Sequence, residues 1–207
     1  MKIHDLAMPV SPEEGLKRLR DGNERFLNGS ARFPTVQKEV LASLAREQRP
    51  YATILGCSDS RVPPELVFDA NFGELFVIRV AGNVLSPEVA GSMQYAVAHL
   101  KTPLCVVLGH ENCGAVQAAL DRKFRKARHL LRMELLIKNI LPSLENIDKH
   151  AQPAAQIACA VEANVRWTMR QIAESPEGRA RKREGTYMLA GAIFEIATGR
   201  VRFLEQI

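Results

Sequence analysis

The fold depends most on the stretch YATILGCSDSR, residues 51–61. Its first six residues form an apolar run of strand length, which predicts a buried β-strand. Its polar tail, Cys57 to Arg61, then emerges where this strand ends. In open parallel α/β sheets, ligands bind at the carboxyl ends of the strands. The stretch therefore predicts both a central strand and a candidate site at its end.

A second apolar run, PLCVVLG at 103–109, ends in the same way with the segment HENCG at 110–114. Two strand ends at one sheet edge would bring together Cys57, His110 and Cys113. Zinc binds Cys thiolates and His nitrogens, and a catalytic zinc has three protein ligands and one open position. The sequence therefore predicts a three-ligand metal site. The competing interpretation is a disulfide or redox pair between Cys57 and Cys113, which is disfavoured in a chain with no export signal.

Asp59 and Arg61 lie two residues apart, so in an extended segment their side chains project to the same side. Asp59 can act as a fourth metal ligand, or it can pair with Arg61 and leave the metal open to water. Arginine suits the second role because its planar fork binds a carboxylate bidentately. An ordinary surface ion pair, which contributes little to stability, is the third alternative.

The remaining pattern alternates strands and helices, as in a parallel sheet with crossover connections. Strands are expected at 51–56, 74–80 and 103–109, and a hairpin at 187–204 turns at Thr198-Gly199. Helices are expected at 12–28, 36–47, 63–68, 87–100, from 113 onward, 130–140 and 154–174, with a surface loop at 176–185. The fold class is α/β: a mostly parallel central sheet flanked by helices, ending in a β-hairpin.

The 207 residues suit one domain, with a helical arm at 1–35 that extends to a partner subunit, a site-bearing core at 36–120, and a helical region with the hairpin at 121–207. The net charge of +5 is a weak argument for nucleic acid, and the basic clusters at 122–128 and 179–183 are typical of solvated faces. No apolar run is long enough to span a membrane. We expect a cytoplasmic protein without nucleic-acid or membrane partners.

The motif CSDSRVP at 57–63, together with GELFV at 73–77 and GHENCGAV at 109–116, resembles the β-class carbonic anhydrases. The resemblance implies reversible hydration of CO2 to bicarbonate and a proton, by attack of zinc-bound hydroxide. It implies one Zn2+ per chain, held by Cys57, His110 and Cys113. By the same resemblance, Asp59 either closes the zinc or binds Arg61 and so admits water.

Further family positions follow from the resemblance alone. Gln48 stands where the family has a substrate-binding glutamine, Phe76 and Tyr95 match the aromatics of the CO2 pocket, and Ala81 and Gly114 match its small residues. The family builds its active site at a dimer interface, which implies a homodimer and leaves a tetramer open. Ile54 replaces a tryptophan that some members use to hold an inhibitory bicarbonate, which favours the form with water on zinc.

Two alternatives remain open in the sequence. Some relatives hydrolyse CS2 or COS, which are linear and apolar like CO2. An inactive zinc-stabilised scaffold module is the other alternative, and it would be marked by a missing ligand or a broken Asp-Arg pair. All five motif residues, Cys57, Asp59, Arg61, His110 and Cys113, are present.

Overall fold

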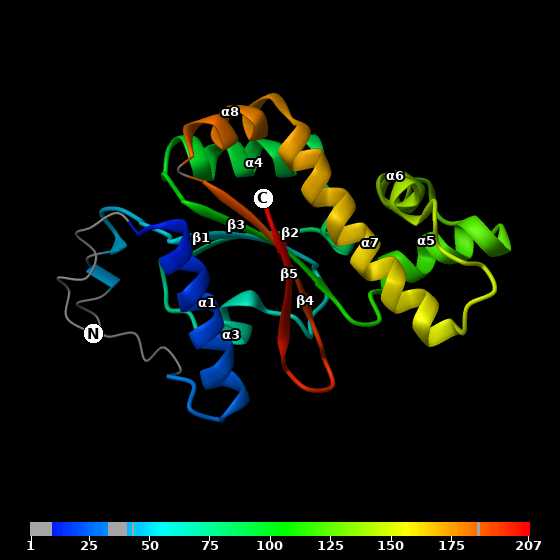
Figure 1. Ribbon diagram of the computed structural model, residues 1–207, viewed down its shortest axis with the longest axis horizontal. Coiled ribbons are helices and arrows are strands. Elements are labelled where there is room, and N and C mark those ends of the chain that lie inside the picture. Colours follow the sequence, from blue (N-terminus) through cyan, green and yellow to red (C-terminus); the bar gives the residue numbers. More distant parts are fainter. Residues whose placement is uncertain (1–9, 33–40, 43, 186) are drawn as a thin grey trace.

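The protein forms one five-stranded sheet in the order β2-β1-β3-β4-β5, as a computed structural model of the chain shows (Figure 1). The structure describes residues 10–32, 41–42, 44–185 and 187–207. The strands are β1 (Ala52–Gly56), β2 (Leu75–Arg79), β3 (Leu104–His110), β4 (Met188–Phe194) and β5 (Val201–Gln206). The first four run parallel and β5 is antiparallel to β4. The predicted mostly parallel sheet and terminal hairpin are confirmed.

The strand order places β1 and β3 side by side at the centre of the sheet. The chain leaves β1 for β2 on one side and returns to β3 on the other, so the carboxyl ends of β1 and β3 form a topological switch point. Both strands are buried along their whole length. The two apolar runs therefore form the adjacent central strands, and the polar segments that follow them meet at the position where such sheets bind ligands.

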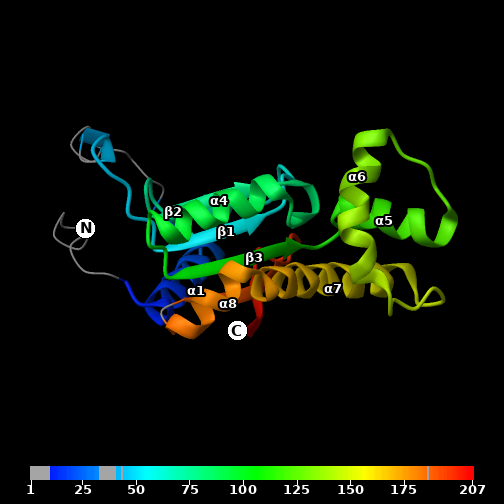
Figure 2. The same ribbon diagram turned by 90° about the horizontal axis from the view of Figure 1, so that it is seen from above.

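Helices cover both faces of the sheet (Figures 1 and 2). On one face, α1 (Pro12–Leu27) and α3 (Pro64–Val67) pack over a core that contains Leu19, Ile54 and Phe68. On the other face, a larger core contains Leu55, Val107 and Met169. The helical elements of that face are α4 (Pro87–Ala98), α5 (Gly114–Arg125), α6 (Leu131–Ile140), the 3-10 segment Leu141–Leu144, α7 (Pro153–Glu174) and α8 (Pro176–Glu184).

The first helix packs on its own sheet. Ser11 caps α1 by accepting a hydrogen bond from the Glu14 N–H. Gly22 allows the helix to lie against the backbone at Phe68, since a Cβ there would stand 1.8 Å from the Phe68 oxygen. Leu16 and Leu19 are buried in the same core. The helix α1 therefore packs on its own sheet, and its contact with a partner subunit stays a prediction.

The segment 176–185, expected as a surface loop, is helix α8, which corrects that prediction. Ser175 accepts a hydrogen bond from the Gly178 N–H, Pro176 occupies the first helical position, and Gly185 ends the helix with a φ of 67°. These capping signals outweigh the polar composition. Half of the helix expected at 36–47, residues 36–40 and 43, lies outside the described residues. Among the described residues, the helices are too short or too polar to span a bilayer.

A buried carboxylate fastens the end of α1 to the turn after α3. The Asp69 side chain is 3% exposed and pairs with Arg25 and Arg32, and it also accepts a hydrogen bond from the Arg32 N–H at 2.7 Å. Burial acts to raise the pKa of Asp69, but the hydrogen bonds from the two arginines outweigh it and lower the pKa. The ionised form is therefore the one that stabilises the fold.

We expect Asp69→Asn to lower the free energy of unfolding by about 1–3 kcal/mol at neutral pH, because bonds to a charged group are lost. Asparagine tolerates the φ of 44° at this position, so the backbone is not strained. A carboxyl with a depressed folded pKa contributes its stability above its unfolded pKa of about 4 and loses it below. Urea unfolding is therefore expected to give a difference that shrinks below about pH 4, with the exposed Asp21→Asn as control. An equal effect of both variants would contradict this role.

Candidate metal centre

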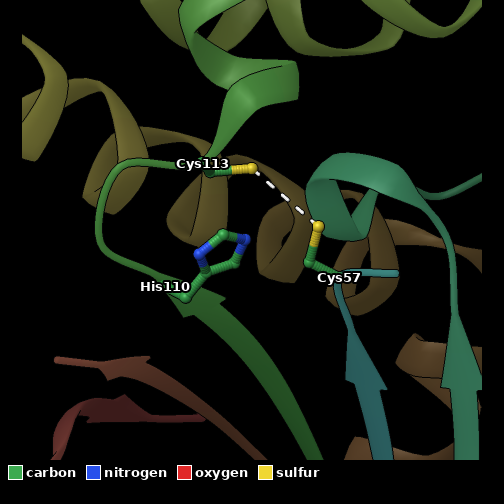
Figure 3. A group of neighbouring side chains, drawn as sticks. All are labelled: Cys57, His110 and Cys113. Carbon is green, nitrogen blue, oxygen red and sulfur yellow. Dashed lines mark hydrogen bonds between the residues drawn. The ribbon is translucent and has the colours of Figure 1, made fainter. Parts of the chain in front are cut away.

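Three side chains from two neighbouring strands meet at the switch point (Figure 3). Cys57 follows the last residue of β1, His110 is the last residue of β3, and Cys113 is the N-cap residue of α5. The two sulfur atoms lie 3.9 Å apart, and one ligand atom from each residue lies within 4.8 Å of the others. The structure thus brings together the three residues that the sequence predicted as metal ligands.

The His110 ring has one nitrogen without a partner. The residue is fully buried, and its Nδ1 lies 2.9 Å from the carbonyl oxygen of Glu111. A carbonyl can only accept, so Nδ1 carries the proton and Nε2 keeps a free lone pair. Nε2 is buried without a hydrogen-bond partner. A buried acceptor nitrogen beside two thiols is the donor set that zinc prefers, with the second-shell bond that such a histidine ligand requires.

The two thiols titrate as a pair. The hydrogen bond from the Cys113 thiol lowers the pKa of Cys57, against the effect of burial and with help from the Gly82 N–H. The same contact, together with burial, raises the pKa of Cys113 well above its ordinary value. The two sulfurs therefore keep one proton between them. A divalent cation bound by both thiolates would take the place of that proton.

The backbone turn at Ala81–Asn83 supports Cys57 from the side of β2. The Gly82 N–H donates a hydrogen bond to Cys57 Sγ at 3.3 Å. Gly82 has a φ of 73°, and a Cβ at this position would stand 2.9 Å from Ile140 Cδ1. Glycine is thus required by both the backbone conformation and the space. The turn also places Ala81, a predicted pocket residue, beside the metal ligands.

Asp59 is held by Arg61 and not by the three-ligand cluster. Arg61 donates from Nε to Oδ1 at 2.9 Å and from a terminal nitrogen to Oδ2 at 2.8 Å, and its backbone N–H adds a third bond at 3.0 Å. These bonds hold the pKa of Asp59 well below its usual range. Asp59 Oδ2 still lies 3.9 Å from His110 Nε2. The carboxylate therefore sits beside the site while its lone pairs are engaged by the arginine.

Arg79 fixes the loop that carries Asp59. Its guanidinium donates to the carbonyl oxygens of Cys57 at 2.9 Å and of Asp59 at 2.6 Å. Because Arg79 ends β2, it ties the loop after β1 to the neighbouring strand. The resemblance and the spacing of the motifs assigned Arg79 no role. A basic residue at a strand end beside a polar loop is the signal that could have suggested it.

The other predicted site residues divide into two groups. Gly114 begins α5 next to Cys113 and is exposed, with no atom within 4 Å of the position of a Cβ. Gln48, Phe76 and Tyr95 do not join the cluster. Gln48 precedes the amino end of β1, and Phe76 pairs with Thr53 near the amino end of that strand, whereas Cys57 follows its carboxyl end. The Tyr95 ring lies 6.0 Å from the Phe76 ring and is 46% exposed.

Two polar residues on the buried face of α7 anchor the turn at Ala81–Asn83, and the sequence analysis missed both. Asn164 is 1% exposed and donates from Nδ2 to the Gly82 oxygen at 2.8 Å. Thr168, one turn later, donates to the Asn83 oxygen at 3.2 Å. An asparagine and a threonine four residues apart within the apolar stripe of a helix were the available signal.

We expect Asn164→Ala to weaken zinc binding by about 10- to 100-fold, because a residue that orients a metal ligand is lost. Asn23→Ala is the matched control: Asn23 is also buried and donates to the carbonyl oxygens of Val67 and Gly199, but it lies on the opposite face of the sheet. Competition with a chromophoric chelator measures the affinity. The same loss of affinity in both variants would mean that Asn164 only supports the fold.

Comparison with known proteins points to one family. A family model described as carbonic anhydrase matches residues 52–201. The carbonic anhydrase of Mycolicibacterium smegmatis is 37% identical over 206 residues, with 97% of each chain covered. Carbonic anhydrase 2 of Mycobacterium tuberculosis is 49% identical over 111 residues, 54% of each chain. A solved β-carbonic anhydrase from Coccomyxa, in complex with acetazolamide, has a TM-score of 0.74 and 27% identity, covering 93% of this chain and 87% of that one.

Proposed function

This chain belongs to the β-class carbonic anhydrase family, and from that premise we propose that it hydrates CO2 to bicarbonate and a proton on one zinc ion per chain. The observation that carries the proposal is the buried cluster Cys57, His110 and Cys113, in which His110 Nε2 has no partner. Three ligands complete only part of a tetrahedral zinc site. The fourth position is the one that a catalytic zinc leaves for water.

Zinc held by Cys57 Sγ, His110 Nε2 and Cys113 Sγ would act as a Lewis acid that lowers the pKa of a bound water. The protein's own groups prepare that position. Glu111 fixes the tautomer of His110 through its carbonyl oxygen, and the Gly82 N–H stabilises the Cys57 thiolate. The three ligand atoms lie within 4.8 Å of one another, close enough to share one ion.

The Asp59–Arg61 pair is proposed to control access to the fourth position. Asp59 Oδ2 lies close enough to His110 Nε2 to compete for the metal, but Arg61 binds both carboxylate oxygens. While the pair persists, Asp59 is ionised and can only accept hydrogen bonds. It would therefore favour, at the fourth position, an oxygen that carries a proton to donate. Release of Asp59 from Arg61 would bring a fourth protein ligand to the metal and exclude water.

A homodimer would complete the substrate pocket. From Gln48 to Cys57 an extended chain covers roughly 30 Å at about 3.3 Å per residue, and Phe76 also lies toward the amino ends of the strands. These residues lie toward the amino ends of the strands, whereas the cluster lies at the carboxyl ends. Phe76 and Tyr95 instead form an aromatic pair with an exposed edge. We propose that this pair and Gln48 line the site of a second copy, in a homodimer or a dimer of dimers.

The pH dependence of CO2 hydration tests the proposed chemistry. Two thiolates cancel the formal charge of zinc, so a bound water would lose its proton less readily than on a zinc held by three histidines. We therefore expect the rate to rise from neutral to alkaline pH, and to do so at a higher pH than for a site with three histidines. Stopped-flow measurement with a pH indicator follows the rate. A rate that stays flat from neutral to alkaline pH would contradict the proposal.

Sulfide release from CS2 or COS, measured on the same preparation, tests the alternative substrates, which are expected to react more slowly than CO2.

A further inference from the structure

The positive charge of the chain is concentrated in one projecting segment. We define the basic hairpin as residues 121–140, which comprise the second half of α5, the connecting residues and α6. It holds seven Lys and Arg residues against two Asp and Glu, a net charge of +5 that equals the net charge of the whole chain. All other residues together are electrically balanced. The basic hairpin therefore carries the excess positive charge that would attract anions to this molecule.

The same hairpin exposes large apolar side chains at its tip. Leu130 is 79% exposed and Leu131 is 78% exposed, followed by Leu135 at 57% and Met133 at 45%. Among the described residues these are four of the nine exposed large hydrophobic side chains. Neighbouring apolar residues of α6, Ile137 and Ile140, are fully buried. The helix thus packs through one face and presents leucines to the outside on another, which marks an interaction surface.

The tip is held in place by contacts within the hairpin. Glu134 accepts a hydrogen bond from Arg122 Nε at 3.1 Å and another from the His129 N–H at 3.0 Å. One carboxylate therefore links the end of α5, the connecting residues and the start of α6. Figure 2 shows α5 and α6 at one end of the molecule, with α6 projecting beyond the sheet. The Glu134 contacts therefore hold in place the segment that carries the exposed Leu130 and Leu131.

We propose that the basic hairpin docks the protein on bilayers that contain anionic lipids, with Leu130 and Leu131 entering the headgroup region and the surrounding arginines and lysines contacting lipid phosphates. Leucines ringed by Lys and Arg are the composition of interfacial membrane-binding segments. In the sequence alone the basic cluster at 122–128 is typical of a solvated face; the leucines exposed beside it favour a lipid partner.

Other partners fit these observations less well. A nucleic acid would use the basic side chains but leave the exposed leucines without a role. A symmetric contact between two copies at this tip would bring together two segments of charge +5, which repel each other. A bound peptide helix requires an apolar groove, whereas Leu130 and Leu131 keep 79% and 78% of their surface exposed and so stand out from their surroundings. An anionic lipid surface satisfies both the charge and the apolar side chains.

Co-sedimentation with vesicles tests the proposal on the full-length, zinc-loaded protein. We expect binding to vesicles of phosphatidylcholine with phosphatidylglycerol, weaker binding at high salt, and no binding to phosphatidylcholine alone. The double substitution Leu130→Ser with Leu131→Ser is expected to lower the partition coefficient by about tenfold or more. Arg128→Gln and Arg132→Gln are each expected to lower it by about fivefold.

Matched controls come from other exposed positions. Leu66→Ser removes an exposed leucine from α3 on the opposite face, and Lys182→Gln with Arg183→Gln removes two exposed charges from α8. These variants are expected to sediment like the unaltered protein. CO2 hydration and circular dichroism are expected to remain unchanged in every variant, which keeps this result independent of the proposed enzyme activity.

Three outcomes would overturn the proposal. The first is no sedimentation with phosphatidylglycerol vesicles. The second is binding that depends on the arginines but not on the leucines and is abolished by competing duplex DNA, which identifies a nucleic-acid surface. The third is a lower mass in light scattering for the double leucine variant, which identifies a contact between subunits.

Discussion

Cys57→Ala is expected to lose zinc and to lower the rate of CO2 hydration by at least about 10³-fold, since the Lewis acid is lost with the ligand. Among the described residues, Cys57 is one of three side chains that form the candidate metal cluster, and its sulfur lies 3.9 Å from that of Cys113. Without it, one thiolate and one imidazole remain, which is too few to hold zinc in competition with a chelator. Metal analysis and stopped-flow hydration, measured on the same sample, report both losses.

Cys105→Ala is the matched control for this experiment. Cys105 lies in β3, is as deeply buried as the ligands, and stands outside the three-residue cluster. Burial raises the pKa of its thiol to about 12, so this cysteine is protonated at neutral pH and unsuited to bind a metal. Its variant is expected to keep zinc and activity. A Cys57→Ala protein that retains a full equivalent of zinc would remove Cys57 from the ligand set.

Asp59→Ala is expected to keep zinc while lowering the rate of CO2 hydration by about 10- to 100-fold. Asp59 lies beside the cluster but is bound by Arg61, so its removal takes away an acceptor next to the fourth position without removing a ligand. Arg61→Gln is expected to be at least as damaging, because it frees Asp59 to bind the metal. Zinc content and the pH profile of the rate distinguish these variants from the Cys57 variant.

The double variant tests whether Asp59 and Arg61 act as a pair or independently of each other. If Arg61 acts by holding Asp59, then Asp59→Ala with Arg61→Gln behaves like Asp59→Ala alone, since no carboxylate remains to be held. Glu184→Ala removes a comparable exposed partner of an arginine, Arg181, far from the site in the chain. It is expected to leave the rate unchanged. Additive losses in the double variant would show that the two residues do not act as a pair.

Local patterns in the sequence were sufficient for the centre of the fold. The runs at 51–56 and 103–109 are largely apolar because β1 and β3 are covered on both faces. It could therefore be predicted that both runs are buried strands and that they end at the same edge of the sheet. The three ligands follow directly from the ends of these two strands. The capped segment at 176–185 was misjudged because its basic composition concealed the Ser-Pro start and the Gly185 end of α8.

Contacts between distant segments could not be predicted. The Gly82 N–H that reaches Cys57, and Asn164 that holds Gly82 in place, depend on how α7 lies across the sheet. No local periodicity encodes that arrangement. The sequence left open whether Asp59 binds the metal or Arg61. Asp59 is hydrogen-bonded to Arg61 here, and its role at a zinc-loaded site stays a prediction. The part that Gln48 and Phe76 would play in the site of a second copy stays a proposal.

The most direct test of zinc-dependent CO2 hydration is a stopped-flow assay of one preparation in three states: as purified, after removal of zinc by a chelator, and after return of one equivalent per chain. We expect acceleration over buffer at alkaline pH, its loss on chelation, and its recovery on zinc addition, while Cys57→Ala remains inactive throughout. CO2 hydration that remains after zinc has been removed would contradict the central claim. So would a protein that carries one zinc per chain and does not accelerate CO2 hydration.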